Sequence, residues 1–267
     1  MLPPALVAEL AHRLYQARKS RTQLRQFSRQ HPQMTIEDGY AIQQAWIDIK
    51  LGAGSRLVGH KIGLTSRAMQ SSANIREPDY GVILDHQIIV DGQDVDIGRF
   101  ISPRVEVELA FIIKDELRGP NCTIFDVLNA TDYVVPAVEI IDARIQRLNP
   151  ETGRNRTVLD TISDNAALGA VILGGRPMRP GAVDLRWTAA LLSKNGIIEE
   201  TGVAAGVLNH PANGIAWLAN KLARHDVALE PGHVVLAGSF TRPTPAEAND
   251  SFHVDYGPMG AIAWRFV

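Results

Sequence analysis

The sequence predicts an α+β protein that combines a helical N-terminal region with a large β-sheet system. Helical spacing of apolar residues dominates roughly the first 56 residues. From about Leu57 onward the chain consists of short apolar runs separated by Gly, Pro, Asp and Asn, a pattern typical of strands and turns. Strand-like runs outnumber helical ones there without regular alternation, which favours α+β over a doubly wound sheet. We therefore expect a helical cap region over 1–56 and a sheet-based body over 57–267, either as separate units or as one continuous domain.

Two helices are expected in the cap region. Over 4–18, Leu6, Leu10 and Leu14 are spaced four residues apart and would form one apolar stripe. A second helix is expected to begin at Thr35, a good N-cap, and to end near Gly52. Asp38 follows Thr35 by three residues, which is the spacing of a capping box.

The body is expected to contain several short strands and two helices. The strand-like runs cover 82–84, 87–90, 106–113, 134–141, 168–173, 189–192, 234–237 and 261–266. Helical patterns interrupt them over 123–129 and 212–225. The stretch 77–81 contains Pro and Gly and is expected to form a turn.

Composition bounds the kind of protein. Hydrophobic residues make up 45% and charged residues 21% of the chain, as in ordinary globular proteins. The formal net charge of −2 gives no electrostatic reason to expect a nucleic acid or membrane partner. Cys122 is the single cysteine, which excludes an intrachain disulfide and is compatible with a reducing compartment. No signal peptide or membrane-spanning run is evident, so a cytoplasmic protein is expected.

Two glutamates lie in the strand-like stretch 102–113. Because strand side chains alternate between faces, Glu106 and Glu108 point the same way, while Val105 and Val107 point into a core. Two carboxylates at neighbouring same-face positions repel each other unless a positive charge lies between them. Oxygen ligands favour a hard divalent cation such as Mg²⁺ or Mn²⁺. The alternative is a solvent-facing strand of ordinary charges.

A third glutamate strengthens the metal interpretation. Glu139 is the one acid in the apolar run 133–141, where burial without a partner would be costly. Glu139 could instead pair with Arg144 or lie at an exposed edge. Three glutamates on two strand-like segments suit an octahedral ion that keeps positions open for substrate and water.

Two further residues are acid–base candidates. Lys61 lies between Gly59 and Gly63 in an apolar context, where desolvation would lower its pKa and permit proton transfer. The alternative is a lysine that extends from a strand to water. Asp79, in the expected turn, could be a second acid–base group or could only close the turn.

Two polar segments are candidate substrate contacts. Residues 161–166 precede an apolar strand and could cap it or form a pocket wall. In the stretch 232–241, a strand runs into a Gly-Ser turn. Glycine there would let backbone N–H groups approach a substrate carboxylate, with the hydroxyl of Ser239 as a further donor. No CxxC, HExxH, GxGxxG or P-loop pattern occurs in the sequence.

Four segments in this order resemble one family. They are HKIGLT at 60–65, PRVEVELAF at 103–111, VPAVE at 135–139 and SDNA at 163–166. The resemblance is to the 2-oxopent-4-enoate hydratase and 4-oxalocrotonate decarboxylase branch of the fumarylacetoacetate-hydrolase-like superfamily. It implies a mixed, rolled β-sheet and a homo-oligomer. Its matching positions imply metal ligands at Glu106, Glu108 and Glu139, catalytic groups at Lys61 and Asp79, and substrate contacts at Ser163, Asp164 and Asn165.

The resemblance also implies an activity. Segments 25–28 and 31–38 look most like the members of this branch that hydrate 2-oxo-hept-4-ene-1,7-dioate in homoprotocatechuate catabolism, giving 4-hydroxy-2-oxoheptanedioate. A metal-dependent 2-oxo-acid decarboxylase, an acylpyruvate hydrolase and a non-catalytic partner subunit are alternatives. The His–Glu dyad of the superfamily's hydrolases is not evident, which favours hydration. The second carboxylate of a diacid needs a cation, and the sequence leaves Arg67, Arg76, Arg154 and Arg156 unranked.

Overall fold

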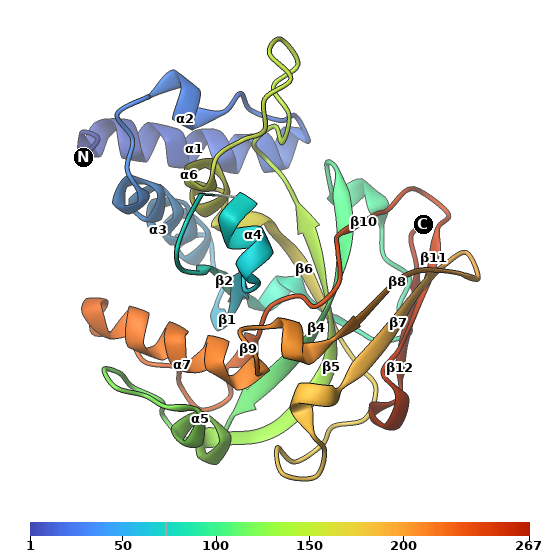
Figure 1. The fold of residues 1–267 in the computed structure, drawn as a ribbon. Coiled ribbons are helices and arrows are strands. Elements are labelled where there is room, and N and C mark those ends of the chain that lie inside the picture. The colour runs from blue at the N-terminus through green and yellow to red at the C-terminus, as the bar shows by residue number, and fades with distance from the viewer. Residues whose placement is uncertain (73) are drawn as a thin grey trace.

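The N-terminal region forms a helical layer in the computed structural model, which describes residues 1–72 and 74–267 (Figure 1). The helices are α1 (Pro4–Ser20), α2 (Phe27–Gln30) and α3 (Ile36–Gly52). Both long helices confirm the sequence prediction. At the start of α3, the Thr35 side chain accepts a hydrogen bond from the backbone of Asp38, and the Asp38 carboxylate accepts one from the backbone of Thr35 at 2.9 Å. This reciprocal capping fixes the first turn of the helix.

The body is built on a mixed sheet, in which eight strands are described. The strand order is β2-β1-β9-β4-β5-β6-β3, with β10 paired to β4, and β1–β9 and β3–β6 are the parallel pairs. The bounds are β1 (Leu57–Gly63), β2 (Asp79–Leu84), β3 (Ile88–Val90), β4 (Pro103–Ile113), β5 (Thr131–Asp142), β6 (Leu168–Leu173), β9 (Val234–Leu236) and β10 (Thr244–Pro245).

A second, antiparallel sheet lies on the right in Figure 1, near the C-terminus. Its order is β12-β11-β7-β8, with bounds β7 (Ala189–Lys194), β8 (Ile197–Val203), β11 (Ser251–Asp255) and β12 (Ala261–Arg265). Short helices flank the two sheets: α4 (Arg67–Ser72), α5 (Ile124–Ala130), α6 (Val158–Ser163) and α7 (Pro211–Leu222). Strands and helices together confirm the predicted α+β class with a mixed, curled sheet.

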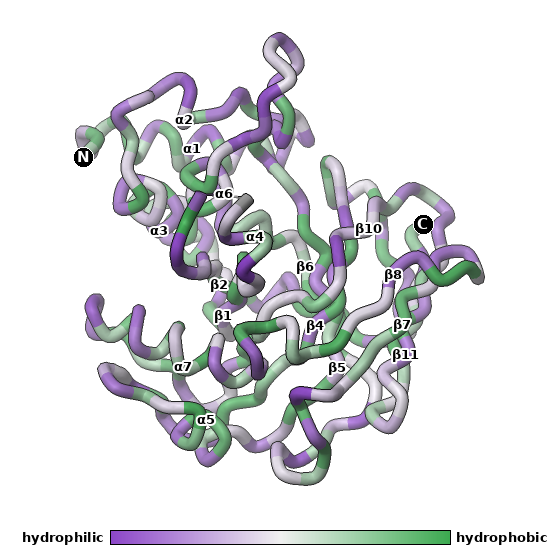
Figure 2. The backbone as a smooth tube through the Cα atoms, in the orientation of Figure 1, coloured by the Kyte–Doolittle hydropathy of each residue, from purple (hydrophilic) through white to green (hydrophobic). Residues whose placement is uncertain are grey.

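The core follows the apolar faces of the central strands. Val105, Val107 and Leu109 of β4 are buried with Val138 and Ile140 of β5 in the largest apolar cluster. Figure 2 shows hydrophobic colour along the central strands and hydrophilic colour on much of the outer loops. A separate cluster joins α1 and α3 through Leu10, Leu14 and Trp46 and includes Ile145 from the body. The division of the chain near residue 56 stays a prediction.

Several local predictions were incomplete or wrong. The expected turn at 77–81 is wrong in its second half, because Asp79 begins β2 and pairs with Gly63 of β1. Strand β8 was not predicted, since its residues are mostly exposed and lack apolar alternation. Strand β11 was also missed, although burial alternates along its five residues. Among the described residues, no helix is long and apolar enough to span a membrane.

Candidate metal and substrate site

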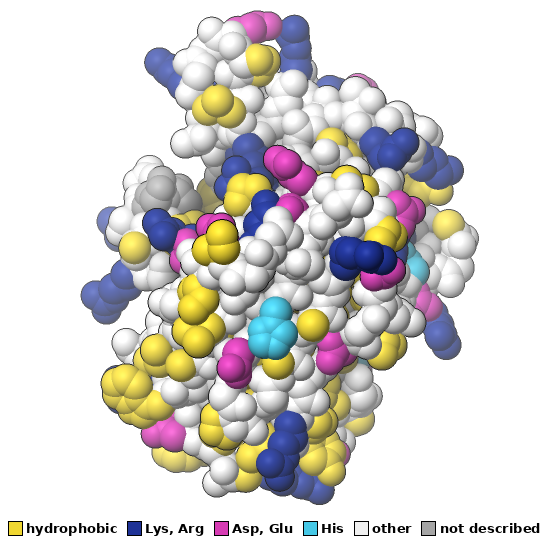
Figure 3. Space-filling view, turned by 90° about the vertical axis from the view of Figure 1, so that its right-hand side faces the viewer, with side chains coloured by type: hydrophobic (Ala, Val, Ile, Leu, Met, Phe, Trp, Pro, Cys, Tyr) yellow, Lys and Arg dark blue, Asp and Glu magenta, His cyan; other side chains and the backbone are white. Residues whose placement is uncertain are grey.

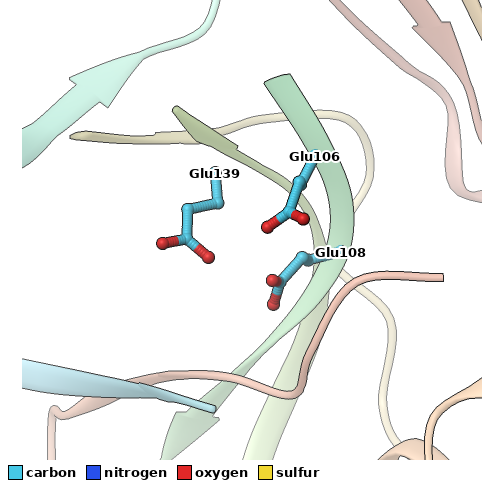
Figure 4. Close-up of side chains that lie close together, drawn as sticks. All are labelled: Glu106, Glu108 and Glu139. Carbon is cyan, nitrogen blue, oxygen red and sulfur yellow. The ribbon is translucent and has the colours of Figure 1, made fainter. Parts of the chain in front are cut away.

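Glu106, Glu108 and Glu139 meet on one face of the β4–β5 pair. Glu106 and Glu139 are register partners in the antiparallel ladder, and Glu108 follows two residues along on the same face. One carboxylate oxygen of each residue lies within 4.8 Å of the other two. Figure 4 shows the three carboxylates turned toward a common point. The sequence predicted that Glu106 and Glu108 share a face, and the pairing of β4 with β5 adds Glu139.

The three carboxylates are strongly perturbed by one another. Glu108 and Glu139 are buried and Glu106 is partly buried. Burial, reinforced by the charge of Glu139, raises the pKa of Glu106 from 4.5 to about 7. The same two causes raise the pKa of Glu108 well above its ordinary value, and burial raises that of Glu139. The protein alone therefore does not stabilise three ionised carboxylates at this point.

The residues present fit a hard divalent cation. Neither oxygen of Glu139 accepts a hydrogen bond of good geometry from the described residues, although both are buried. Buried carboxylate oxygens are usually hydrogen-bonded, and a bound cation would supply these two with a partner. An oxygen-only donor set with three negative charges suits Mg²⁺ or Mn²⁺. The site could thus hold a metal.

Lys61 is the cation closest to this cluster. Its Nζ atom lies 3.2 Å from Oε1 of Glu139, and its side chain is 4% exposed. Glu139 therefore pairs with Lys61, whereas Arg144 pairs with Asp164. Burial favours the neutral amine, but the charges of Glu139, Asp79 and the other two glutamates outweigh it and raise the pKa of Lys61. The predicted lowering of this pKa is wrong, because the sequence did not show that four carboxylates surround the lysine.

Asp79 is brought to the same place by the β1–β2 pairing. As the register partner of Gly63, it lies next to the end of β1 and is buried. An added Cβ at Gly63 would overlap Oδ1 of Asp79, so a glycine is required for this close approach. Burial raises the pKa of Asp79, while the charges of Lys61 and Arg156 oppose the rise. A buried carboxyl group with a perturbed pKa beside a lysine in a cavity is a candidate acid–base group.

A cavity of about 550 Å³ contains these groups. Its polar wall includes Lys61, Asp79, Glu106, Glu108 and Arg156. The apolar part of the cavity wall is formed by Ile62, Leu64, Met69, Ile141, Ala166, Ala167 and Phe240. Glu139 lies beneath this surface rather than in it, fully buried. The cavity therefore combines a polar end that can hold an ion and an α-keto acid with apolar walls for a carbon chain.

The Gly-Ser turn after β9 binds a carboxylate of the protein itself, that of Glu108. The backbone N–H of Gly238 donates to Oε2 of Glu108 at 2.8 Å. Gly238 has a φ of 115°, and an added Cβ would overlap Thr65, so only glycine fits here. The sequence predicted an approach to a substrate carboxylate, and the group approached is Glu108. Ser239 lines the cavity, but its hydroxyl lies 2.9 Å from the carbonyl oxygen of Thr241, to which it can donate.

The predicted contacts from 163–165 lie behind the cavity wall. Ser163 donates to the carbonyl of Leu159 at 2.8 Å, and Asp164 accepts from Nε of Arg144 at 2.6 Å. The side-chain amide of Asn165 makes two hydrogen bonds to the backbone of Val82. None of the three lines the cavity, so substrate contact by these residues stays a prediction that the geometry does not favour.

The segment from Asn165 to Ala167 forms part of the cavity wall. Asn165, Ala166 and Ala167 have φ values of 52°, 47° and 62°, a run of left-handed conformation that alanine rarely adopts. The paired amide of Asn165 and the hydrogen bond from the Ala167 N–H to the Asp164 carbonyl hold this run in place. Ala166 and Ala167 reach the cavity as a result. The sequence offered 161–166 as a possible pocket wall, and Thr161 and Ala166 line the cavity, whereas Ala167 was missed because an alanine carries no chemical signal.

Comparison with known proteins identifies relatives along nearly the whole chain. The chain is 62% identical over 258 residues to the "2-oxo-hept-4-ene-1,7-dioate hydratase" of Escherichia coli, covering 97% of each chain. It superposes with a TM-score of 0.95 on "4-oxalocrotonate decarboxylase from Pseudomonas putida G7", solved with magnesium and adipate, at 32% identity and covering 100% and 99% of the two chains.

A more distant likeness concerns the fold alone. A putative fumarylacetoacetate hydrolase family protein from Yersinia pestis CO92 superposes with a TM-score of 0.59 at 16% identity, covering 78% of this chain and 92% of that one. A scan against protein-family models finds no match. The predicted family and fold are thereby confirmed. The chain belongs to the hydratase and 4-oxalocrotonate decarboxylase family, and it has the fold of fumarylacetoacetate-hydrolase-like proteins.

Proposed function

We propose that the protein is a metal-dependent hydro-lyase that adds water to 2-oxo-hept-4-ene-1,7-dioate and gives 4-hydroxy-2-oxoheptanedioate. The observation that carries this proposal is the convergence of Glu106, Glu108, Lys61 and Asp79 on one cavity, with Glu139 beneath its wall beside them. The 62% identity to the hydratase of E. coli supports the substrate. The convergence supports the chemistry, since hydration of an enone needs a stabilised enolate and two proton transfers.

Glu106, Glu108 and Glu139 would hold the ion, with Mg²⁺ or Mn²⁺ as the proposed cofactor. Bound there, such an ion supplies a Lewis acid that stabilises negative charge on the 2-oxo oxygen of the substrate. Lys61 would remain close by, paired to Glu139 at 3.2 Å. The Gly238 N–H would keep Glu108 in place through its hydrogen bond.

Lys61 and Asp79 would move the protons. Lys61 lies in the cavity beside Glu139, and its Nζ can deliver a proton to C5 of the dienol form of the substrate and take up the proton that the 2-hydroxyl group loses. This transfer moves the double bond into conjugation with the 2-oxo group, and C4 then accepts water. The Asp79 carboxylate can take a proton from that water as the C4–O bond forms and then give this proton to C3, which completes the addition and restores the carboxylate.

A decarboxylase is the second candidate function. The observation that favours it is the TM-score of 0.95 to a 4-oxalocrotonate decarboxylase, whose name assigns loss of CO₂. Both reactions develop negative charge on the same 2-oxo oxygen, so the cluster of carboxylates suits either. The two differ in their products.

The test is to incubate the purified protein with Mg²⁺ and 2-oxo-hept-4-ene-1,7-dioate. We expect the product to carry a hydroxyl group at C4 in its NMR spectrum, without release of CO₂. Release of CO₂ without a hydroxylated product would contradict the hydratase proposal and support the decarboxylase. No turnover until a second protein of the family is added would support a role as a partner subunit.

We also propose that the chain forms a homo-oligomer in the cytoplasm. Trp187, Ile197 and Ile198 are exposed at and near the four-stranded sheet. On this side of the molecule, apolar side chains are interspersed with charges of both signs (Figure 3). Aromatic and apolar side chains are enriched where subunits of an oligomer meet, so these exposed residues support the proposal. The free Cys122 agrees with a reducing compartment. Light scattering after size-exclusion chromatography tests the assembly, and a monomer at micromolar concentration would contradict it.

A further inference from the structure

Arg156 adds a positive charge to a cavity that is otherwise dominated by carboxylates. It precedes α6 and lines the same cavity as Glu106 and Glu108, and its side chain is 12% exposed. Lys61 is the strongest cationic influence on the three glutamates and on Asp79, and Arg156 also acts on Asp79. Arg156 is thus a second cation in the cavity beside the Lys61–Glu139 pair.

The guanidinium of Arg156 has only weak partners in the described structure. Its Nη1 atom lies 3.5 Å from Oδ2 of Asp164 and 3.4 Å from the carbonyl of Ile145, both long for hydrogen bonds. Asp164 is already engaged by Arg144, whose Nε and backbone N donate to it at 2.6 Å and 2.8 Å. A buried guanidinium with such loose pairing retains donors for a further anion.

The neighbouring acid Asp160 does not supply that anion. Its carboxylate accepts hydrogen bonds from the backbone and hydroxyl of Ser28 at 2.9 Å and 2.6 Å and from the backbone of Thr157 at 3.0 Å. Burial and the charge of Arg144 lower the pKa of Arg156, whereas the charges of Asp164, Asp160 and Asp79 oppose this. Among the described residues, Asp164 at 3.5 Å is the one carboxylate within 4.0 Å of the guanidinium.

The structure also ranks Arg156 above the other arginines. Arg242 lines the cavity too, but its side chain is 85% exposed and pairs with Glu200 at 2.8 Å. Arg76 lines a neighbouring cavity that shares Asp79 with this one. Arg67 and Arg154 are exposed and line neither cavity. Among the described residues, Arg156 is the arginine lining this cavity that is both mostly buried and loosely paired.

We infer that Arg156 binds the distal carboxylate of a dicarboxylic substrate and sets the preference for diacids over monoacids. This inference rests on the proposed function for the identity of the substrate. The α-keto acid end would lie at the three glutamates, and the distal carboxylate would accept hydrogen bonds from the guanidinium. Ile62, Leu64 and Ala166 supply apolar wall for the carbon chain between the two ends. Arg156 is therefore assigned as a specificity residue.

The test uses two ligands of equal length that differ only at the distal end, 2-oxoheptanedioate and 2-oxoheptanoate. Their affinities for the Mg²⁺-loaded protein are measured by calorimetry for wild type, Arg156→Gln, Arg156→Lys and the control Arg242→Gln. A charge-assisted hydrogen bond predicts that wild type prefers the diacid on the order of 10- to 100-fold. Arg156→Gln should remove this preference and leave the monoacid affinity unchanged. Arg156→Lys should keep part of it, and Arg242→Gln should keep all of it.

A diacid preference that survives in Arg156→Gln, or that disappears equally in Arg242→Gln, would overturn the inference. Thermal melting of each variant checks folding, and Arg156→Lys provides the answer if Arg156→Gln is unfolded, because a point charge without the guanidinium fork should weaken the preference. The binding measurement does not require turnover. Failure of wild type to hydrate its substrate would contradict the proposed function alone, while the ligand comparison would still decide the role of Arg156.

Discussion

Glu106 and Glu139 are register partners in the β4–β5 ladder and present their carboxylates to the same point, where Glu108 joins them. Like charges directly opposite each other destabilise an antiparallel pair. The chain relieves this repulsion only in part, through Lys61 at 3.2 Å from Glu139 and the Gly238 N–H at 2.8 Å from Glu108. A divalent ion at this point would neutralise the remaining negative charge of the three carboxylates.

Glu106→Gln should stabilise the metal-free protein and abolish stabilisation by Mg²⁺. The amide removes one of the mutually repelling carboxylates, which should raise the free energy of unfolding by about 1 kcal/mol in the presence of a chelator. The same change removes a proposed ligand. Thermal melting with EDTA and with Mg²⁺ measures both effects. Glu199→Gln, at an exposed position, is the matched control and should change neither. An unaltered shift with Mg²⁺ in Glu106→Gln would exclude Glu106 as a ligand.

Metal binding should release protons and strengthen as the pH rises toward 7. In the metal-free protein the pKa of Glu106 is raised from 4.5 to about 7, so below pH 7 a proton must leave before an ion can bind. Between pH 4.5 and 7 the folded metal-free state binds more protons than the unfolded state. The contribution of Glu106 to the free energy of unfolding of the metal-free protein therefore falls as the pH rises through this window.

Calorimetry in two buffers with different ionisation enthalpies measures the proton release directly. We expect release of protons at pH 6 and a smaller release at pH 8. The Mg²⁺ affinity should be lower at pH 6 than at pH 8. Affinity that is the same at both values, with no proton release, would show that the carboxylates are already ionised in the metal-free protein.

Lys61→Met should abolish turnover while the protein still binds Mg²⁺. Loss of a proton-transfer group costs a factor on the order of 10² to 10⁴ in rate. Removal of the Lys61 charge leaves three carboxylates without their cation, so metal affinity should be kept or increased. Steady-state kinetics at saturating Mg²⁺ and a metal titration separate the two effects. Lys114→Met, at an exposed position beside Asp115, is the control. Wild-type turnover by Lys61→Met would remove Lys61 from the mechanism.

Asn165→Ala should destabilise the fold by about 3 kcal/mol. The substitution leaves the N–H and carbonyl of Val82 without their partners in a buried place, and it puts a third alanine in a left-handed run. Denaturant unfolding measures the loss. Asn129→Ala, where the side chain is exposed, should stay within about 0.5 kcal/mol of wild type. A similar small effect at Asn165 would mean that its amide does not support the cavity wall.

Residue pattern alone predicted much of this architecture. The capping box at Thr35 and Asp38, the alternation in β4 and the lone acid in β5 are local signals, and each predicted its element correctly. The resemblance then identified Lys61 and Asp79 as part of one site. Local patterns fail where burial depends on distant segments. Asp79 was expected in a turn because Pro78 and Gly81 flank it, yet pairing with β1 makes it the start of a buried strand.

Electrostatic roles were harder to predict than positions. The pKa of Lys61 depends on carboxylates from β2, β4 and β5, whose convergence no single segment reveals. Asp164 and Asn165 are polar residues in a matching motif, and their side chains are used to hold Arg144 and Val82 rather than to face the cavity. The four unranked arginines could be separated only by burial and pairing, which place Arg156 in the wall.

The most direct test of the central claim is a crystal structure of the protein with Mn²⁺ and oxalate, in which anomalous scattering locates the ion. We expect one strong anomalous peak within coordination distance, about 2.2 Å, of an oxygen of each of Glu106, Glu108 and Glu139, with oxalate on the open positions. A peak bound elsewhere, or none at this cluster when Mn²⁺ is saturating, would contradict the account.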